Sequence, residues 1–281
     1  MNHIGNILFV AEGSPGEQPA FRRALGLARE RRSTLTILRA SGVPFDPSDQ
    51  VHENAEAKSA NFHVEITEGQ ATPEDVARFA KRGQFDLIIK AACNRGVVIT
   101  SLFSDPDAEL IRIAPCPVWI IRPASSTRGG PARVLAAVNP VYANSGGGGL
   151  APQVLEVAAS LARHTNGELH VVNAWRVAAE GMLRGRPIHV SDIHRLLRTI
   201  RAAHEKQLDR LLKQQDVAGT TVHIHKGRAD AVIRGLLRRW HFDDIVIGSK
   251  PGSGPLSLFR SGIAEKVLRS ADCSVFAVKQ A

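Results

Sequence analysis

Short apolar runs alternate with amphipathic stretches along the whole chain. In the first half the runs predict five strands: NILFVAE (6–12), TLTILR (34–39), FHVEIT (62–67), LIIKAA (87–92) and VWIIR (118–122). Between them, apolar residues recur at helical spacing through Phe21, Leu25 and Ala28, then over 75–80, and a short helix precedes the last strand. Such runs are typical of parallel strands that are buried on both faces. Right-handed crossovers then place helices on both sides of the sheet.

The second half repeats this order. Its expected strands are 134–139, 168–174, 221–226, 244–248 and 274–279, and its expected helices are 153–164, 229–240 and 262–270. Residues 24–40 align with 158–174, and an offset of 157 residues takes Cys116 onto Cys273. We therefore expect an α/β protein with two tandem doubly wound (Rossmann-like) domains, 1–123 and 132–281. Each domain has a mostly parallel five-stranded sheet, and the Pro-, Gly- and Ser-rich stretch 123–132 has the composition of a linker.

The second half also contains an inserted amphipathic helix. Its apolar positions recur at helical spacing: Ile193, Leu196, Leu197, Ile200, Leu208, Leu211 and Leu212. The plain interpretation is that this stripe packs against the sheet. The sharper alternative is that it roofs a ligand cavity, with Trp175, Met182 and Leu183 at the entrance.

Charge and composition narrow the choice of partner. The 281 residues carry a formal net charge of +9. This positive charge invites a nucleic-acid interpretation, but the basic residues are spread and do not interleave with aromatics. No apolar run reaches the ~18 residues of a membrane span, and the N-terminus lacks a signal-peptide pattern, so we expect a cytoplasmic protein without a membrane partner. The three cysteines are too few for a disulfide framework, and Cys116 and Cys273 are expected to be buried.

Enzyme and metal signatures are missing from the sequence. There is neither a phosphate-binding G-x-x-x-x-G-K-[ST] loop nor a G-x-S-x-G elbow, so we expect no catalytic turnover. His223 and His225 stand two apart on an expected strand, where they share one face and a metal could bridge them. No further ligands stand nearby in the sequence, so we expect a structural role and no metal.

The segment 245–279 resembles the C-terminal part of universal stress proteins. That family has a glycine-rich loop after the fourth strand and a Gly-Ser or Gly-Thr pair that opens the last helix. The helix continues in the style of AEKVLR, and a Cys-x-Val strand ends the domain. Each half of the chain resembles one domain of this family, so the resemblance covers the whole chain. It is closest to the tandem, E-type members, and the segments that carry this likeness are AAVNP (136–140), 160–175 and 182–185. It implies a doubly wound fold, a cytoplasmic role in the stress response and, in one branch, ATP binding.

The resemblance also implies where a nucleotide would bind in the second half. The matching positions are Asn139, Gly248, Ser249, Gly252, Ser261 and Gly262. Pro251 replaces the second loop glycine and has no N–H to donate to a phosphate. Ser261 and Gly262 reverse the expected pair, and Asn139 replaces an acidic residue. We expect ATP affinity to be weak or absent, and confined to this half.

The first half matches the nucleotide pattern less well. Its loop, 90–110, has Gly96 as its only glycine. Asp105 and Asp107 stand where phosphates would lie, and like charges repel. Glu12 occupies the acidic position alone, so we expect this half to be a structural partner.

The resemblance further implies that the halves pair through their last strands. Both final strands, 117–122 and 274–279, are apolar, and an exposed apolar edge invites association. Pairing would place Val118, Ile120, Val275 and Ala277 at the contact. A homodimer is also compatible with the sequence.

Together these features predict a stress-response protein that binds a small ligand, apolar or otherwise, or a protein partner, without catalytic turnover. One alternative is an ATP-binding regulator with slow hydrolysis at the second-half loop. Another is a nucleic-acid-associated basic protein.

Overall fold

The computed structural model describes most of the chain. The described residues are 4–14, 16–47, 64–93, 105–123, 130–141, 149–177, 190–217, 219–249 and 262–279. They form two compact units, one made of 1–130 with 243–281 and the other of 131–242. We call them unit 1 and unit 2 and describe each by itself.

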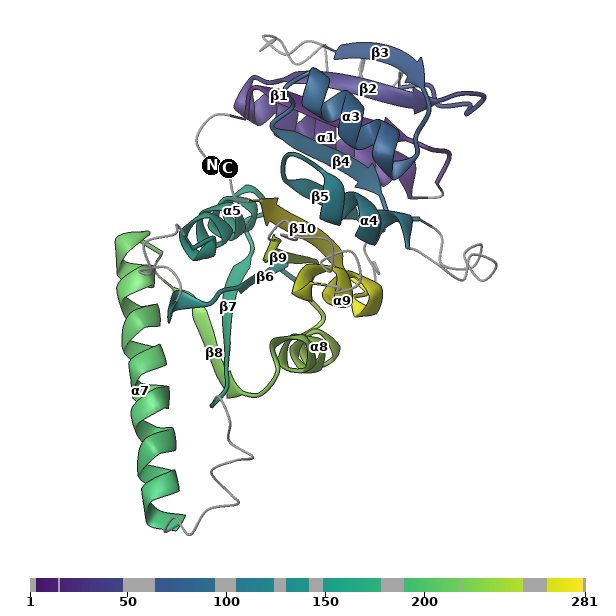
Figure 1. Cartoon of the computed structure of the whole chain (residues 1–281). Helices are drawn as coiled ribbons and strands as arrows, with labels where there is room; N and C mark the ends of the chain where they lie inside the picture. The colour runs from purple at the N-terminus through teal and green to yellow at the C-terminus, as the bar shows by residue number, and fades with distance from the viewer. Residues whose placement is uncertain are drawn as a thin grey trace. The chain divides into compact units, whose positions relative to one another are not determined.

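Unit 1 contains a seven-stranded run of sheet in the order β3-β2-β1-β4-β5-β10-β9 (Figure 1). The strands are β1 (Asn6–Ala11), β2 (Thr34–Ala40), β3 (Val64–Gly69), β4 (Leu87–Ala91), β5 (Val118–Ile121), β9 (Asp244–Ser249) and β10 (Ser274–Lys279). The helices are α1 (Glu17–Arg31), α3 (Pro73–Arg82), α4 (Pro106–Ile113) and α9 (Ile263–Ser270). β1, β2, β3, β4 and β5 pair in parallel, as do β9 and β10. The central strands β4 and β5 are buried along their whole length and are apolar apart from Lys90 in β4, as expected for parallel strands covered on both faces.

Unit 2 repeats the first three strands of this order. Its strands are β6 (Arg133–Ala137), β7 (Glu168–Trp175) and β8 (Thr221–Lys226), and they pair in parallel as β6-β7-β8. Its helices are α5 (Ala151–His164), α7 (Val190–Gln214) and α8 (Ala229–Trp240). The order matches β1-β2-β3 of unit 1, as the sequence repeat predicts. The domain limits 1–123 and 132–281 stay a prediction from that repeat.

Helix ends follow from local sequence. α3 begins at Pro73, one residue after Thr72, whose hydroxyl accepts the Asp75 N–H at 3.3 Å. Proline is well suited to the first position of a helix, because its fixed φ is helical and its missing N–H would have no intrahelical partner. The expected helix over 75–80 is therefore two residues longer at each end.

The last strands of the two halves pair with each other inside unit 1. β5 and β10 run antiparallel, with Val275 opposite Ile120 and Ala277 opposite Val118. All four side chains are fully buried. The predicted contact between the halves is confirmed, and the sheet continues across it without an exposed edge.

Polar side chains around Trp119 stabilise the pairing of β5 with β10. The indole N–H of Trp119 donates to Asp244 Oδ1 at 3.1 Å, and Arg23 pairs with Asp244 Oδ2 at 2.6 Å. The Arg23 guanidinium also lies 4.3 Å from the centre of the Trp119 ring. Trp119 faces Phe276 in the strand register, and the offset of 157 residues takes one onto the other, so this pair marks a local two-fold axis.

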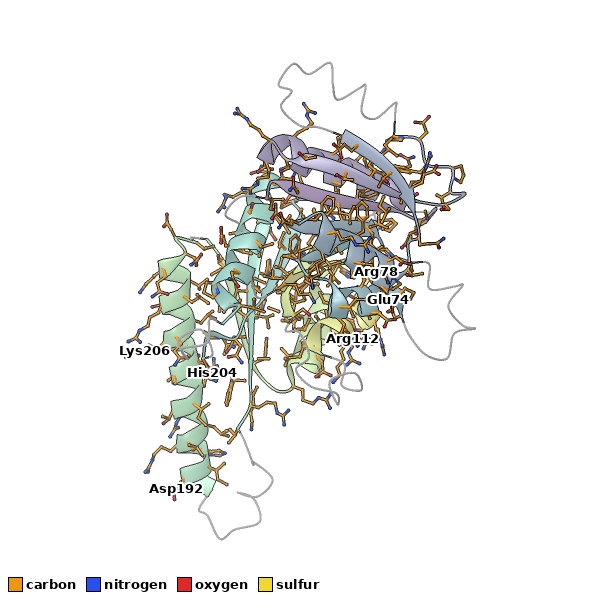
Figure 2. All side chains as sticks on the ribbon, turned by 45° about the horizontal axis from the view of Figure 1, so that its top comes forward. Glu74, Arg78, Arg112, Asp192, His204 and Lys206 are labelled. Atoms are coloured by element: carbon orange, nitrogen blue, oxygen red, sulfur yellow. The ribbon has the colours of Figure 1, made fainter. Side chains whose placement is uncertain are left out.

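α7 is the amphipathic insertion predicted from the sequence, and only part of it packs. Leu208 and Leu211 are 1% and 3% exposed, whereas Leu196 is 40% exposed. The N-terminal end of the helix, marked by Asp192 in Figure 2, extends past the ends of β7 and β8. Packing against the sheet is therefore confirmed for the C-terminal part of the stripe alone. Met182 and Leu183 lie outside the described residues.

Candidate functional site

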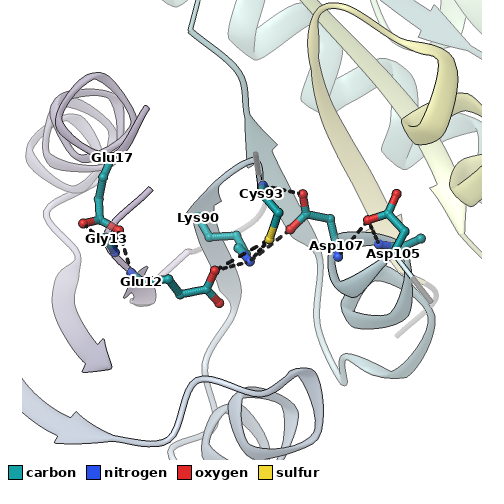
Figure 3. Close-up of polar contacts among 8 residues, drawn as sticks. Glu12, Gly13, Glu17, Lys90, Cys93, Asp105 and Asp107 are labelled. Atoms are coloured by element: carbon teal, nitrogen blue, oxygen red, sulfur yellow. Dashed lines mark hydrogen bonds and ion pairs between the residues drawn. The ribbon is translucent and has the colours of Figure 1, made fainter. Parts of the chain in front are cut away.

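The carboxyl ends of β1 and β4 meet at the edge of the sheet where doubly wound folds bind ligands. Lys90, in the buried strand β4, points its ammonium between two carboxylates (Figure 3). Its Nζ lies 2.6 Å from Glu12 Oε2 and 3.0 Å from Asp107 Oδ1. Burial alone would lower the pKa of Lys90, but Asp107 and Glu12 outweigh it, so this pKa lies above its ordinary value. Lys90 therefore stays charged and neutralises the acidic residues around it.

Carboxylates also occupy the backbone donors at this edge. Glu17 Oε1 accepts the N–H groups of Glu12 and Gly13 at 2.6 and 3.0 Å (Figure 3). Asp107 Oδ2 accepts the Cys93 N–H at 2.8 Å. Backbone N–H groups in such loops and at helix N-termini are the donors that a ligand phosphate would need. Here the side chains of the protein already occupy them.

Asp105 completes this arrangement at the start of α4. Its Oδ1 accepts the N–H groups of Asp107 and Ala108 at 3.1 and 3.4 Å, which caps the helix. From the sequence, Asp105 and Asp107 are expected to repel phosphates, and this expectation stays a prediction. In the structure both side chains accept backbone N–H groups that a phosphate would need as donors.

Cys93 lies beside Lys90 but is not set up as a nucleophile. Its Sγ is 3.4 Å from Lys90 Nζ and 3.8 Å from Glu12 Oε2. Burial raises the pKa of the Cys93 thiol to about 12, so the reactive thiolate is scarce at neutral pH. Cys116 and Cys273 are buried as predicted, and burial raises the pKa of each to about 12.

The residues predicted for a nucleotide in the second half are divided between the units. Gly248 and Ser249 end β9 and Gly262 is the N-cap of α9, all in unit 1, whereas Asn139 follows β6 in unit 2. Asn139 is exposed, and its Oδ1 accepts the Val141 N–H at 3.3 Å. Gly252, Ser261 and Pro251 lie outside the described residues. The combined site stays a prediction.

Glu265 stands at the start of α9, where a phosphate would bind. A Cβ at Gly262 would lie 2.6 Å from Glu265 Oε2, so this carboxylate is folded back onto the first turn of the helix. Glu265 is 7% exposed, and among the described residues its Oε2 has no hydrogen-bond partner. A buried carboxylate at this position repels a phosphate. Glu265 was not among the residues predicted for the site, although an acidic residue three positions after an N-cap is a recognised capping signal.

The histidines of β8 pack rather than gather around a metal. His223 Nε2 lies 3.0 Å from His170 Nδ1, and the Trp240 ring contacts both imidazoles. Burial and the neighbouring His170 and His225 lower the pKa of His223. Across the described part of the chain, no three His, Cys, Asp or Glu side chains are grouped as metal ligands would be.

A polar pair lies at the junction between the buried and exposed parts of the α7 stripe. His204 Nδ1 is 2.9 Å from Asn173 Oδ1, and Asn173 Nδ2 donates to the Val138 carbonyl at 3.1 Å. Because the Asn173 oxygen can only accept, His204 Nδ1 carries the proton. Burial lowers the pKa of His204, which favours the neutral ring, with Nε2 as an acceptor. The Trp175 ring lies beside it, with the ring centres 6.1 Å apart.

Comparison with known proteins identifies the family. The model of the universal stress protein family matches residues 133–279, more than half of the chain. The chain belongs to the universal stress protein family. Universal stress protein E of Escherichia coli K12 is 24% identical over 98% of this chain and 93% of its own length. The Salmonella typhi protein of the same name is 26% identical over 98% and 94%.

Solved structures support the fold. A Pseudomonas aeruginosa PAO1 protein of unknown function superposes with a TM-score of 0.73 at 23% identity, covering 98% of this chain and 92% of its own. A universal stress protein of Archaeoglobus fulgidus gives 0.58 at 18% identity, covering 99% and 97%. The expected tandem, Rossmann-like α/β architecture is therefore confirmed. Among the described residues, no helix is both long and apolar enough to cross a bilayer.

Proposed function

We propose that this universal stress protein acts in the cytoplasmic stress response by binding a small ligand, without catalytic turnover. The observation that carries the proposal is the junction on α7, where an apolar stripe meets the fixed Asn173–His204 pair and Trp175. Small-ligand sites combine apolar surface with a few precisely held polar groups. Nothing in this group of residues is arranged as a nucleophile with its base.

The chemistry of this junction selects a class of ligand. The neutral His204 ring offers Nε2 as an acceptor, so it recognises a hydroxyl or N–H donor. The aliphatic residues of α7 and the Trp175 ring favour a hydrocarbon portion. The ligand is therefore an uncharged or weakly charged amphiphile with a hydrogen-bond donor, rather than a nucleotide.

The ATP-binding alternative is less well supported. Internal carboxylates occupy the donors of the first half, and Glu265 lies on the first turn of α9. A triphosphate would have to displace these groups or bind beside the negative charge of Glu265.

Native mass spectrometry of the purified full chain tests this function. We expect a small molecule other than a nucleotide to be retained, and His204→Leu to lose most of it because the acceptor is gone. His194→Leu is the matched control, since His194 lies exposed on the same helix. Retention that is equal in both variants, or retention of a nucleotide alone, would contradict the proposal.

A further inference from the structure

The N-terminal part of α7 carries an apolar stripe that the described residues leave partly uncovered. Ile193, Leu197 and Ile200 are half-buried and Leu196 is 40% exposed, although Leu208 on the same face is buried. Residues 190–201 lie along the end of the helix that extends past β7 and β8 (Figures 1 and 2). Aliphatic side chains that are partly exposed in a row are costly in water, so this stripe is a candidate surface for a partner.

The opposite face of α7 is strongly basic. Its charged residues are Arg195, Arg198, Arg201, Lys206, Arg210 and Lys213 against Asp192, Glu205 and Asp209. Three of the bases pair along the helix, in Arg195–Asp192, Arg201–Glu205 and Lys213–Asp209. Within the described residues, Arg198, Lys206 and Arg210 have no ion-pair partner. The helix therefore presents uncompensated positive charge beside its apolar stripe.

One kind of occupant satisfies both faces. Nucleic acid would neutralise the basic face and leave the stripe in water. The α7 helix of a second copy would cover the stripe but bring two basic helices together. An anionic bilayer accepts apolar side chains at its headgroup boundary and attracts the bases through its surface potential.

We propose that residues 190–201 of α7 dock on an anionic lipid surface. The stripe of Ile193, Leu196, Leu197 and Ile200 enters the headgroup region, while Arg198 and Arg201 remain at the level of the lipid phosphates. This contact is peripheral, because the helix lies in the plane of the interface and does not cross the bilayer. It departs from the expectation of no membrane partner, which rested on the lack of an apolar run long enough to span a bilayer. It goes beyond the small-ligand function and does not depend on His204.

Vesicle co-sedimentation of the full chain tests the docking, with phosphatidylglycerol–phosphatidylcholine vesicles against phosphatidylcholine alone. We expect binding to the anionic vesicles that weakens with added salt. Leu196→Asp and Arg198→Glu should each lower the partition coefficient by about tenfold or more. The matched controls are Ile263→Asp, at an exposed isoleucine of α9, and Arg163→Glu, at an exposed arginine of α5.

Several results would overturn the proposal. One is that the native chain does not bind anionic vesicles, and another is that Leu196→Asp binds them as well as the native chain does. A third is that Arg163→Glu loses as much binding as Arg198→Glu, which would show that only the net charge of the protein matters. Tighter binding to duplex DNA that Leu196→Asp leaves unchanged would assign the helix to a polyanion instead. Self-association that Leu196→Asp abolishes would assign the stripe to a second copy. Circular dichroism confirms that each variant is folded, and native mass spectrometry of the same samples reports separately on the small ligand.

Discussion

Replacing Lys90 with methionine removes the cation that lies between Asp107, which is buried, and Glu12, which is partly buried. Met is close to Lys in length, so the substitution changes charge far more than packing. Lys90 is 2% exposed, and it holds Glu12 and Asp107 at 2.6 and 3.0 Å. Removing one partner from a buried charged group costs about 3–5 kcal/mol, because the remaining charges are left uncompensated. We expect the thermal midpoint to fall by roughly 10 °C at pH 7.5.

The stability deficit of Lys90→Met should depend on pH. The folded-state pKa of Lys90 lies above the ordinary value. Its stabilising contribution is therefore complete below pH ~10.4 and is lost only as the pH rises beyond that value. In Lys90→Met the two orphaned carboxylates take up protons at a higher pH than usual. The difference in midpoint between Lys90→Met and the native chain should therefore narrow between pH 7.5 and pH 5.

Two further variants test whether the lost stability comes from the buried charges left by Lys90→Met and not from the loss of any lysine. Lys81→Met, at an exposed lysine of α3, should change the unfolding free energy by less than about 0.5 kcal/mol. Adding Glu12→Gln and Asp107→Asn to Lys90→Met should recover much of the lost stability, because the two carboxylates that lost their cation are then neutral amides. Circular-dichroism melting of all four proteins measures these effects. A Lys90→Met protein as stable as the native chain, or a deficit that is the same at both pH values, would refute the reasoning.

Two more outcomes follow from unit 1. Trp119→Phe keeps the aromatic contact with Phe276 but leaves Asp244 without its indole donor, so urea unfolding should show a loss of about 1–3 kcal/mol; unchanged stability would show that this hydrogen bond does not hold the halves together. Burial lowers the pKa of Lys279 to about 8, so an NMR titration of the lysine Cε resonances should show one signal with a midpoint near that pH, absent in Lys279→Met. A native titration with every lysine near pH ~10.4 would contradict it.

The strand pattern and the pairing of the halves could be predicted from the sequence. Parallel strands buried on both faces leave a continuous apolar signal, and the repeat made each assignment in one half a check on the other. The contact between β5 and β10 followed from two apolar edges and the family resemblance. Its register, with Trp119 opposite Phe276, was beyond the pattern.

The ion pairs of Lys90 in the first half could be predicted only in part. Lys90 within the apolar run LIIKAA signals a buried cation, and a buried cation requires a carboxylate. Which carboxylates meet it depends on the fold, since Glu12 is 78 residues away. Likewise the α7 stripe predicted an amphipathic helix, but periodicity alone does not show where packing stops along it.

In this protein, the chain's own carboxylates are expected to occupy or repel the phosphate positions of both halves. Calorimetric titration of ATP with Mg²⁺ into the full chain measures whether they do so. The account predicts no saturable binding at micromolar concentrations, and an affinity about tenfold higher in Glu265→Gln, because the variant keeps the shape of the side chain without its charge. Micromolar ATP binding by the native chain that Glu265→Gln leaves unchanged would contradict it.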